Sequence, residues 1–223
     1  MYISPSRKIG FVHIQKTGGS TIEFILSKHI SDFQNVGSKH STVREAARKI
    51  DNWDTYFSFT FVRNPWDRLV SWYSMIEEAG QIKLIDTIKS RRNFMRYKRA
   101  RQWSSWKEVI RKTNSFDKFV RSLSEISITP SGQPKFARNQ LDYLLDEHGN
   151  ISVDFIGRLE NFQADVETLL EKIEISPNNI KLSKKNKSKH NHYSQYYSPE
   201  TRDIVEQLYQ RDIEHFGYEF EEE

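Results

Sequence analysis

A short apolar run near the start of the chain leads directly into two glycines and then into a helical pattern. Residues 8–14 (KIGFVHI) are apolar and rich in β-branched side chains, which predicts a buried strand. Ile22, Ile25 and Leu26 recur at helical spacing, so we expect a helix that begins near Ser20. In α/β folds, ligands bind beyond the carboxyl ends of the strands, and the two glycines lie at such a place.

A strand followed by a helix returns twice along the chain. Residues 56–62 (YFSFTFV) predict a strand, and Pro65 suits the first position of the helix that follows. Residues 151–157 (ISVDFIG) predict another strand, followed by a helix with an apolar stripe over 162–173. This alternation predicts an α/β fold, a P-loop-like three-layer arrangement in which helices flank a mainly parallel sheet.

Capping residues predict further helices. Thr42 opens a capping-box sequence, which predicts a helix over residues 43–50. Ser115 and Ser198 are expected to cap two later helices, the last of which ends near Gly217.

The chain shows no internal repeat and no clear linker between domains. With 223 residues, a single domain over 1–223 is the expectation. The polar segments 129–134 and 183–191 are expected to be loops. The lysines of segment 183–191 fit a loop that closes over a nucleotide and a solubilising surface loop equally well.

The composition excludes several classes of site. The chain has no cysteine, which excludes disulfides, thiolate catalysis and cysteine-based zinc sites. No apolar run approaches the roughly 20 residues that a bilayer span needs, and the first residues lack the apolar region of a secretory signal. A cytoplasmic location is therefore our expectation.

Positive charge is concentrated in one segment. The net charge is +4, but residues 89–112 contain ten Lys/Arg residues against one acid, Glu108, which leaves the rest of the chain at −5. Aromatic residues are interspersed there: Phe94, Tyr97, Trp103 and Trp106. The segment either holds an anionic partner, such as an acidic acceptor, or is an amphipathic helix with a charged outer face.

The segment QKTGGST, residues 15–21, has the composition of a phosphate-binding loop. Gly18 and Gly19 let the backbone close around an anion, and Lys16 adds a full positive charge. The remaining donors are hydroxyl groups, those of Thr17, Ser20 and Thr21. Because Lys16 precedes both glycines, the loop is not a Walker A motif. The alternative is a glycine-rich turn with an incidental lysine.

A second motif, FVRNPWDRLVS, occupies residues 61–71. Arg63 ends the strand predicted over 56–62, so its guanidinium can reach the same sheet edge as Lys16. Arginine suits phosphate because its planar fork donates two parallel hydrogen bonds. Ser71 lies about two turns into the following helix.

These two motifs resemble the two PAPS-binding signatures (PAPS is 3′-phosphoadenosine-5′-phosphosulfate) of the carbohydrate sulfotransferases, specifically the heparan sulfate 2-O- and chondroitin/dermatan sulfotransferases. The resemblance continues in residues 154–161 (DFIGRLEN), 193–197 and 212–220 (DIEHFGYEF), and it is weakest from about 80 to 135. The chain differs from the family in having Gln15 where proline is common.

The resemblance implies a role for each motif. Residues 16–21 would hold the 5′-phosphosulfate of PAPS, and Lys16 would steady the charge on the bridging oxygen as it leaves. Arg63 and Ser71 would hold the 3′-phosphate. The reaction would move the sulfuryl group to a hydroxyl of a carbohydrate, an anionic carbohydrate included. It would release adenosine 3′,5′-bisphosphate and would need no metal.

A base must take the proton of the acceptor hydroxyl, and His40 is our candidate. His40 lies just before the helix that Thr42 is expected to cap, and a helix N-terminus keeps an imidazole neutral. The resemblance supports a histidine base in this region, although a lone loop histidine is more often simply solvated. His13 is expected to be either a satisfied core group or a group that supports the site from behind, and Glu23 fits either the site or a solvated helix face.

Three alternatives to a sulfotransferase site are a metal site, a nucleotide kinase and a nucleic-acid-binding module. His190 and His192 form an HxH pair, which is weak support for a metal site. A P-loop nucleotide kinase would share the loop and the fold, but it should show Gly-Lys-Ser/Thr and a magnesium-binding acid. A basic nucleic-acid-binding module would explain segment 89–112 but would leave both motifs unexplained.

Overall fold

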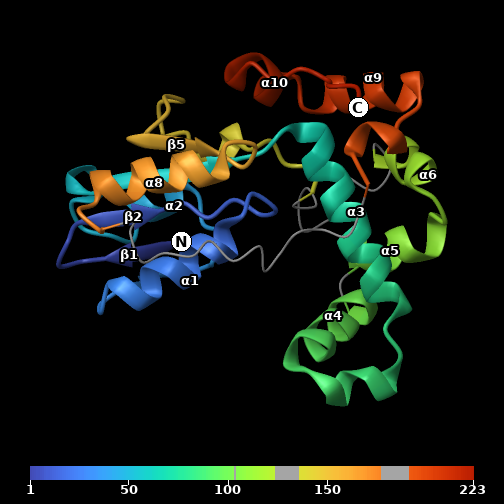
Figure 1. The fold of residues 1–223 in the computed structure, drawn as a ribbon, viewed down its shortest axis with the longest axis horizontal. Helices are drawn as coiled ribbons and strands as arrows, with labels where there is room; N and C mark the ends of the chain where they lie inside the picture. Colours follow the sequence, from blue (N-terminus) through green and yellow to red (C-terminus); the bar gives the residue numbers. More distant parts are fainter. Residues whose placement is uncertain (103, 124–135, 177–190) are drawn as a thin grey trace. The chain divides into compact units, whose positions relative to one another are not determined.

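A computed structural model of the protein describes residues 1–102, 104–123, 136–176 and 191–223. The chain divides into two compact units, which we describe separately (Figure 1). The first unit contains Met1–Asn64 and Asn139–Lys187, and the second contains Pro65–Arg138 and Ser188–Glu223. A single domain over 1–223 stays a prediction.

The first unit is built on a five-stranded sheet with the order β3-β1-β2-β4-β5 in the described residues. The strands are β1 (Tyr2–Ser4), β2 (Ile9–Phe11), β3 (Gln34–Asn35), β4 (Phe57–Val62) and β5 (Phe155–Arg158). β4 runs parallel to both β2 and β5, whereas β1 is antiparallel to both β2 and β3. β3 therefore runs in the same direction as β2, and among the described strands only β1 is reversed. The prediction of a mainly parallel sheet is confirmed.

Alternate residues of the central strands form the core of this unit. Phe11, Phe59 and Phe61 are fully buried and point to one face of the sheet. On that face they pack against α1 (Gly19–His29) and α8 (Phe162–Lys172), which contribute apolar side chains to the same cluster. The cluster fixes the positions of the loops that follow β2, β4 and β5.

The opposite face of the sheet is covered near β2 by the short helix η1 (Trp53–Thr55). A β-carbon at Gly10 would lie 2.3 Å from the indole ring of Trp53, so this position of the strand has room only for glycine. The preceding helix α2 (Val43–Ala47) contributes the buried side chains Val43 and Ala46. Helices thus flank the sheet, as expected for the α/β class.

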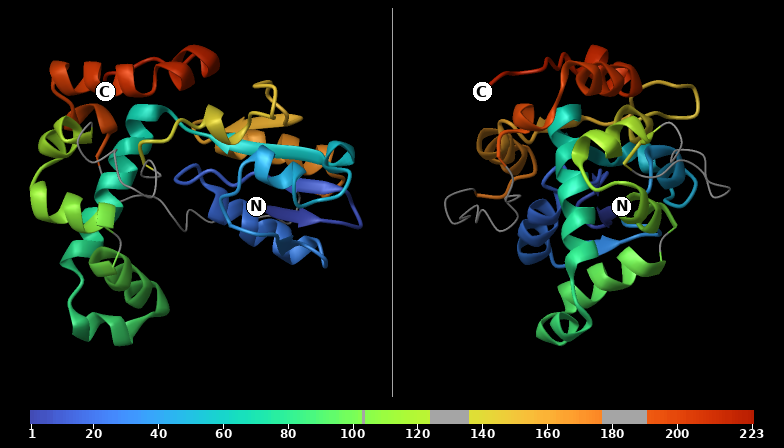
Figure 2. Two further views of the ribbon diagram at one scale, coloured as in Figure 1. Left: turned by 180° about the vertical axis from the view of Figure 1, so that it is seen from behind. Right: turned by 90° about the vertical axis from the view of Figure 1, so that its right-hand side faces the viewer.

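The second unit is helical. Its elements are α3 (Pro65–Gln81), η2 (Leu84–Lys89), α4 (Arg91–Gln102), α5 (Ser104–Lys112), α6 (Phe116–Arg121), η5 (Tyr193–Tyr196), α9 (Pro199–Leu208) and α10 (Gln210–Phe216). Figures 1 and 2 show α4 near the C-terminal end of α3 and α9 near its N-terminal end. Aromatic side chains dominate the interior, among them Trp66, Phe119 and Phe136.

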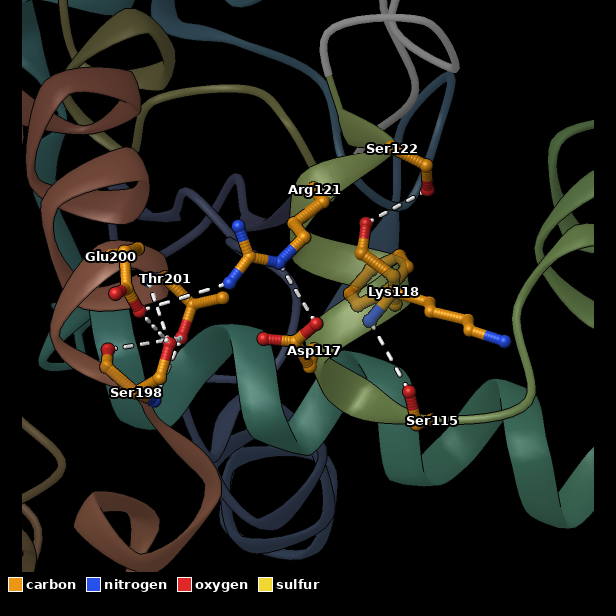
Figure 3. Close-up of polar contacts among 9 residues, drawn as sticks. Ser115, Asp117, Lys118, Arg121, Ser122, Ser198, Glu200 and Thr201 are labelled. Atoms are coloured by element: carbon orange, nitrogen blue, oxygen red, sulfur yellow. Dashed lines mark hydrogen bonds and ion pairs between the residues drawn. The ribbon is translucent and has the colours of Figure 1, made fainter.

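Polar contacts at α6 and α9 confirm two predicted caps (Figure 3). The Ser115 hydroxyl accepts a hydrogen bond from the Lys118 N–H at 3.3 Å, and the Ser198 hydroxyl accepts one from the Thr201 N–H at 3.3 Å. Arg121 pairs with Asp117 within α6 and, at 3.7 Å, with Glu200 of α9. These ion pairs are exposed, so they contribute little to the stability of the fold.

Several predicted boundaries differ from the observed ones. β2 is shorter than residues 8–14, although the N–H of Val12 still donates to the Phe59 carbonyl at 2.9 Å. β5 begins later than residue 151, because Ile151 forms an antiparallel bridge with Leu145 instead. α2 ends before residue 50.

The structure contains two strands, β1 and β3, that the sequence analysis does not predict. The expected loops 129–134 and 183–191 lie outside the described residues, apart from residue 191. Within the described ranges, no helix combines the length and the apolar character that a membrane span requires.

Candidate functional site

The loop between β2 and α1, residues 15–18, is a turn with two left-handed backbone positions. Lys16 has φ 70° and Gly18 has φ 81°. Thr17 is buried, and its hydroxyl donates to the Ile14 carbonyl at 3.0 Å, which closes the turn. No side chain caps the first turn of α1, and that turn contains no acid. The N–H groups and the positive dipole end of this helix therefore face the loop in a form suited to an anion.

Gly18 of this loop and Gly19, the first residue of α1, are packed so closely that no side chain fits. A β-carbon at Gly18 would lie 2.8 Å from the Phe162 ring and 2.9 Å from a Leu159 methyl group. A β-carbon at Gly19 would lie 2.3 Å from the imidazole of His13. The loop is therefore held from two sides, and its backbone path is fixed by packing.

Two residues that the sequence analysis did not identify hold the loop and the end of β4. The Tyr143 hydroxyl donates to the side-chain oxygen of Gln15 at 2.8 Å. The fully buried amide of Gln140 accepts from the N–H of Arg63 at 2.9 Å and donates to its carbonyl at 2.8 Å. Neither residue lies in a motif, so spacing gave no signal for them. Gln15, where the resembling family often has proline, thus has a defined partner.

Arg63 lies against the loop, as the order of the elements implies. Its Nη1 donates to the carbonyl oxygen of Lys16 at 3.2 Å, and the residue is only 7% exposed. The guanidinium has five donor hydrogens, and this hydrogen bond uses one of them. The structure therefore joins the end of β4 to the loop through Arg63, while its role toward a 3′-phosphate stays a prediction.

The neighbours of Arg63 have structural partners. The N–H of Asn64 donates to the Glu160 carboxylate at 2.6 Å. Arg68 is buried on α3, and its Nη1 donates to the Arg138 carbonyl at 3.0 Å. Ser71 is also buried on α3, in the second unit. Its predicted contact with a 3′-phosphate stays a prediction.

His40 is oriented by a hydrogen bond to the chain just before the loop. Its Nδ1 lies 2.8 Å from the carbonyl oxygen of His13. A carbonyl can only accept, so Nδ1 carries the hydrogen and Nε2 is the acceptor nitrogen of the neutral ring. The side chain is half-buried. The expected cause of neutrality was a helix N-terminus, but α2 is only five residues long. The hydrogen bond to His13 fixes which ring nitrogen carries the hydrogen, and a neutral His40 stays a prediction.

His13 lies between His40 and α1. The two imidazole rings are 4.7 Å apart at 69°, and the His13 ring stacks on Phe11 at 5.2 Å. The residue is 3% exposed, and burial lowers the pKa of the His13 imidazole well below its usual value, with the charge of His40 as a second cause. The expectation of a satisfied core group is wrong in one respect: Nδ1 of His13 has no hydrogen-bond partner among the described residues.

Glu23 is engaged in an ion pair next to His40. Its carboxylate accepts from the Tyr2 hydroxyl and pairs with the ammonium group of Lys39. The Lys39 ammonium group also lies 5.6 Å from the centre of the Tyr2 ring. Burial, with the hydrogen bond to Glu23, raises the pKa of Tyr2. Glu23 is thus fixed by a cation and a phenol, which disfavours it as the proton acceptor.

The HxH pair gains no support as a metal site. His190 lies outside the described residues, and the Nδ1 of His192 accepts a hydrogen bond from the Ser194 N–H at 3.4 Å. No group of three or more metal-binding side chains occurs in the part of the chain that the structure describes.

The loop 15–18 leads into the N-terminus of α1, and the imidazole of His40 is hydrogen-bonded to the chain just before this loop. In a comparison with protein-family models, the model described as the sulfotransferase family matches residues 1–219. Searches among curated proteins and among solved structures found no match.

Proposed function

The chain belongs to the sulfotransferase family, and we propose that it transfers the sulfuryl group of PAPS to a hydroxyl group of a carbohydrate, releasing adenosine 3′,5′-bisphosphate. One observation carries the proposal. The imidazole of His40 is hydrogen-bonded to His13, whose own ring packs against the first residue of α1, Gly19. The proposed base and the proposed phosphosulfate loop are therefore parts of one packed structure.

The loop fits the donor that we propose. The side chains packed against Gly18 and Gly19 fix the backbone path of the loop, which is the property that an anion-binding backbone needs. Lys16, Ser20 and Thr21 would add one charge and two hydroxyl donors toward the 5′-phosphosulfate. The buried side chain of Thr17 instead closes the loop, so its contribution would come from its backbone.

The proposed reaction is a single displacement at sulfur. The acceptor oxygen forms a bond to sulfur while the bond from sulfur to the bridging oxygen breaks, and that electron pair goes to the phosphate. Nε2 of His40 takes the proton of the acceptor hydroxyl, which makes the oxygen a better nucleophile. Lys16 and the N-terminus of α1 would neutralise the negative charge on the bridging oxygen.

Replacement of His40 tests the mechanism. His40→Ala should lower kcat by about 10²–10⁴-fold, the usual contribution of a general base, and should leave binding of adenosine 3′,5′-bisphosphate unchanged. His29→Ala is the matched control, because His29 is an exposed histidine at the end of α1. If His40→Ala keeps more than about a tenth of the wild-type kcat, the base is elsewhere. His13 would then be tested next.

Replacement of Arg63 tests the donor. The preference of the protein for adenosine 3′,5′-bisphosphate over adenosine 5′-phosphate should fall at least about tenfold in Arg63→Ala, because a charge-assisted hydrogen bond contributes about 1.5–3 kcal/mol. Arg63→Lys keeps the charge but not the fork, and it should retain part of the preference. Equal affinity of the wild type for both nucleotides would remove the basis of this assignment.

The carbohydrate acceptor and a cytoplasmic location belong to the same proposal. The acceptor rests on the resemblance of the two motifs to carbohydrate sulfotransferases, and the location rests on the composition without cysteine. A screen of polysaccharides and small hydroxyl compounds with labelled PAPS would identify the acceptor. Stabilisation by PAPS but not by ATP with magnesium would separate this proposal from the kinase alternative.

A further inference from the structure

The helical unit carries an exposed surface on which apolar and basic side chains are mixed. We call it the η2–α4 patch, and it contains three aliphatic residues of η2 and five residues of α4. These are Leu84, Ile85, Ile88, Arg91, Phe94, Met95, Lys98 and Arg101. Leu84 is 68% and Ile88 79% exposed, unusually high values for aliphatic side chains. Figures 1 and 2 show α4 at the C-terminal end of α3.

The spacing on α4 places cations and apolar groups on one face. Arg91 and Met95 are four residues apart, and so are Phe94 and Lys98, so each pair lies side by side on the helix. All four side chains are exposed, whereas Ala100 faces the interior. The outer face of α4 therefore presents apolar groups framed by positive charges.

The cations of the patch have no counter-charge within the described residues. No described carboxylate pairs with Arg91, Lys98 or Arg101, and the guanidinium of Arg101 lies 3.6 Å from the centre of the Tyr97 ring. By contrast, Arg96 of the same helix pairs with Glu78 of α3 at 2.7 Å.

The two tryptophans of segment 89–112 do not contribute to the exposed surface that the structure describes. Trp106 is 2% exposed and belongs to the core, and Trp103 lies outside the described residues. Phe94 is exposed and Tyr97 is half-buried against Arg101, so the described part of segment 89–112 offers little ring surface for stacking on sugars. The exposed apolar groups of the η2–α4 patch are mostly aliphatic.

We propose that the η2–α4 patch docks the protein on the surface of an anionic lipid membrane. An anionic glycan or a nucleic acid would use the cations but would leave the aliphatic side chains of η2 in water. A second copy of the chain would cover the aliphatic groups but would bring like charges together. Anionic headgroups with acyl chains beneath them satisfy both kinds of side chain at once.

Co-sedimentation with vesicles tests the proposal on the full chain. The wild type should bind vesicles of phosphatidylcholine with about 30% phosphatidylserine, and binding should fall steeply as salt rises from about 0.05 to 0.5 M because the ionic part is screened. Vesicles of phosphatidylcholine alone should bind at least about tenfold less. Equal binding to both vesicle types would overturn the ionic part of the proposal.

Two variants separate the contributions of charge and apolar area. Arg91→Ala/Lys98→Ala/Arg101→Ala should weaken binding about a hundredfold, since each basic residue near an anionic surface contributes about fivefold. Leu84→Ser/Ile85→Ser/Ile88→Ser should weaken it at least about tenfold. The control, Lys49→Ala/Lys118→Ala/Lys172→Ala, removes three exposed cations outside the patch. A control that loses as much binding as the patch variants would mean that net charge alone is responsible.

The absence of native cysteine allows a direct test of which residues enter the lipid. An environment-sensitive dye attached at Phe94→Cys should shift its emission to the blue on vesicle binding, whereas the same dye at Lys172→Cys should not. The η2–α4 variants should keep the wild-type melting temperature, because they replace exposed side chains only.

The alternatives predict different outcomes, each of which overturns the proposal. Tight binding to heparin that is insensitive to the η2 serine substitutions, without vesicle binding, would identify a glycan site. A dimer in sedimentation equilibrium that these substitutions dissociate would identify an interface between copies. A dye at residue 94 that does not respond to vesicles would show that the patch stays in water.

Discussion

Replacing Gly19 by alanine places a methyl group where the imidazole of His13 lies. The added β-carbon would be 2.3 Å from Nε2 and Cδ2 of His13, whereas carbon atoms in ordinary contact are about 3.5–4.0 Å apart. The ring must therefore move by about 1 Å or more. His13 has little freedom to move, because it is 3% exposed and is stacked on Phe11.

The expected cost of this overpacking is about 1–3 kcal/mol of unfolding free energy. Catalysis should also suffer, because the carbonyl of His13 orients His40. A misplacement of about 1 Å at a proposed base lowers turnover by about 10²-fold. Gly19→Ala should therefore lose both stability and kcat.

A double-mutant cycle isolates the contact. In a His13→Ala background the space beside residue 19 is open, so the glycine-to-alanine change should become neutral or stabilising by up to about 1 kcal/mol, because alanine is the better helix former. The sign of the effect on stability thus reverses between the two backgrounds, and urea denaturation of the four proteins measures it. If Gly19→Ala destabilises both backgrounds equally, the contact with His13 is not the cause and our reading of this packing is wrong.

Two further predictions concern protons and metals. Folding lowers the pKa of His13, so below pH 6.5 the unfolded chain binds a proton at this residue and the folded protein does not. The free energy of unfolding therefore falls by up to about 1.4 kcal/mol per pH unit below that value. His13→Phe should flatten the pH dependence between pH 6.5 and 5 relative to wild type, and an unchanged slope would contradict a neutral buried ring. Sulfuryl transfer should survive EDTA, because Lys16 and the N-terminus of α1 are proposed to neutralise the leaving group. Complete loss, restored only by a divalent ion, would favour the kinase alternative.

The central elements were predictable because their patterns are local. The alternation of aromatic and small residues predicts β4, and Pro65 predicts the start of α3. The capping sequence at Thr42 predicts the start of α2. The first strand of the sheet could not be found this way. β1 has three residues, and what makes it a strand is its pairing with β2 and β3.

The candidate site was only partly predictable for the same reason. The loop with Gly18 and Gly19 is a local motif, and the structure gives both glycines a steric reason. The clamp of Gln140 on Arg63 joins positions 77 residues apart, and a single polar residue without periodicity gives no signal for such a contact. The same is true of the bond between His40 and His13.

The backbone of Lys16 has a consequence for how this protein could evolve. Lysine at φ 70° is in a region that side chains with a β-carbon disfavour by about 1–2 kcal/mol, and glycine would relieve that strain. A selection for thermal tolerance alone would therefore favour glycine at residue 16, and a requirement for the lysine side chain opposes that change. Sequences that have lost their transferase activity but kept the fold should show glycine or asparagine at this position first.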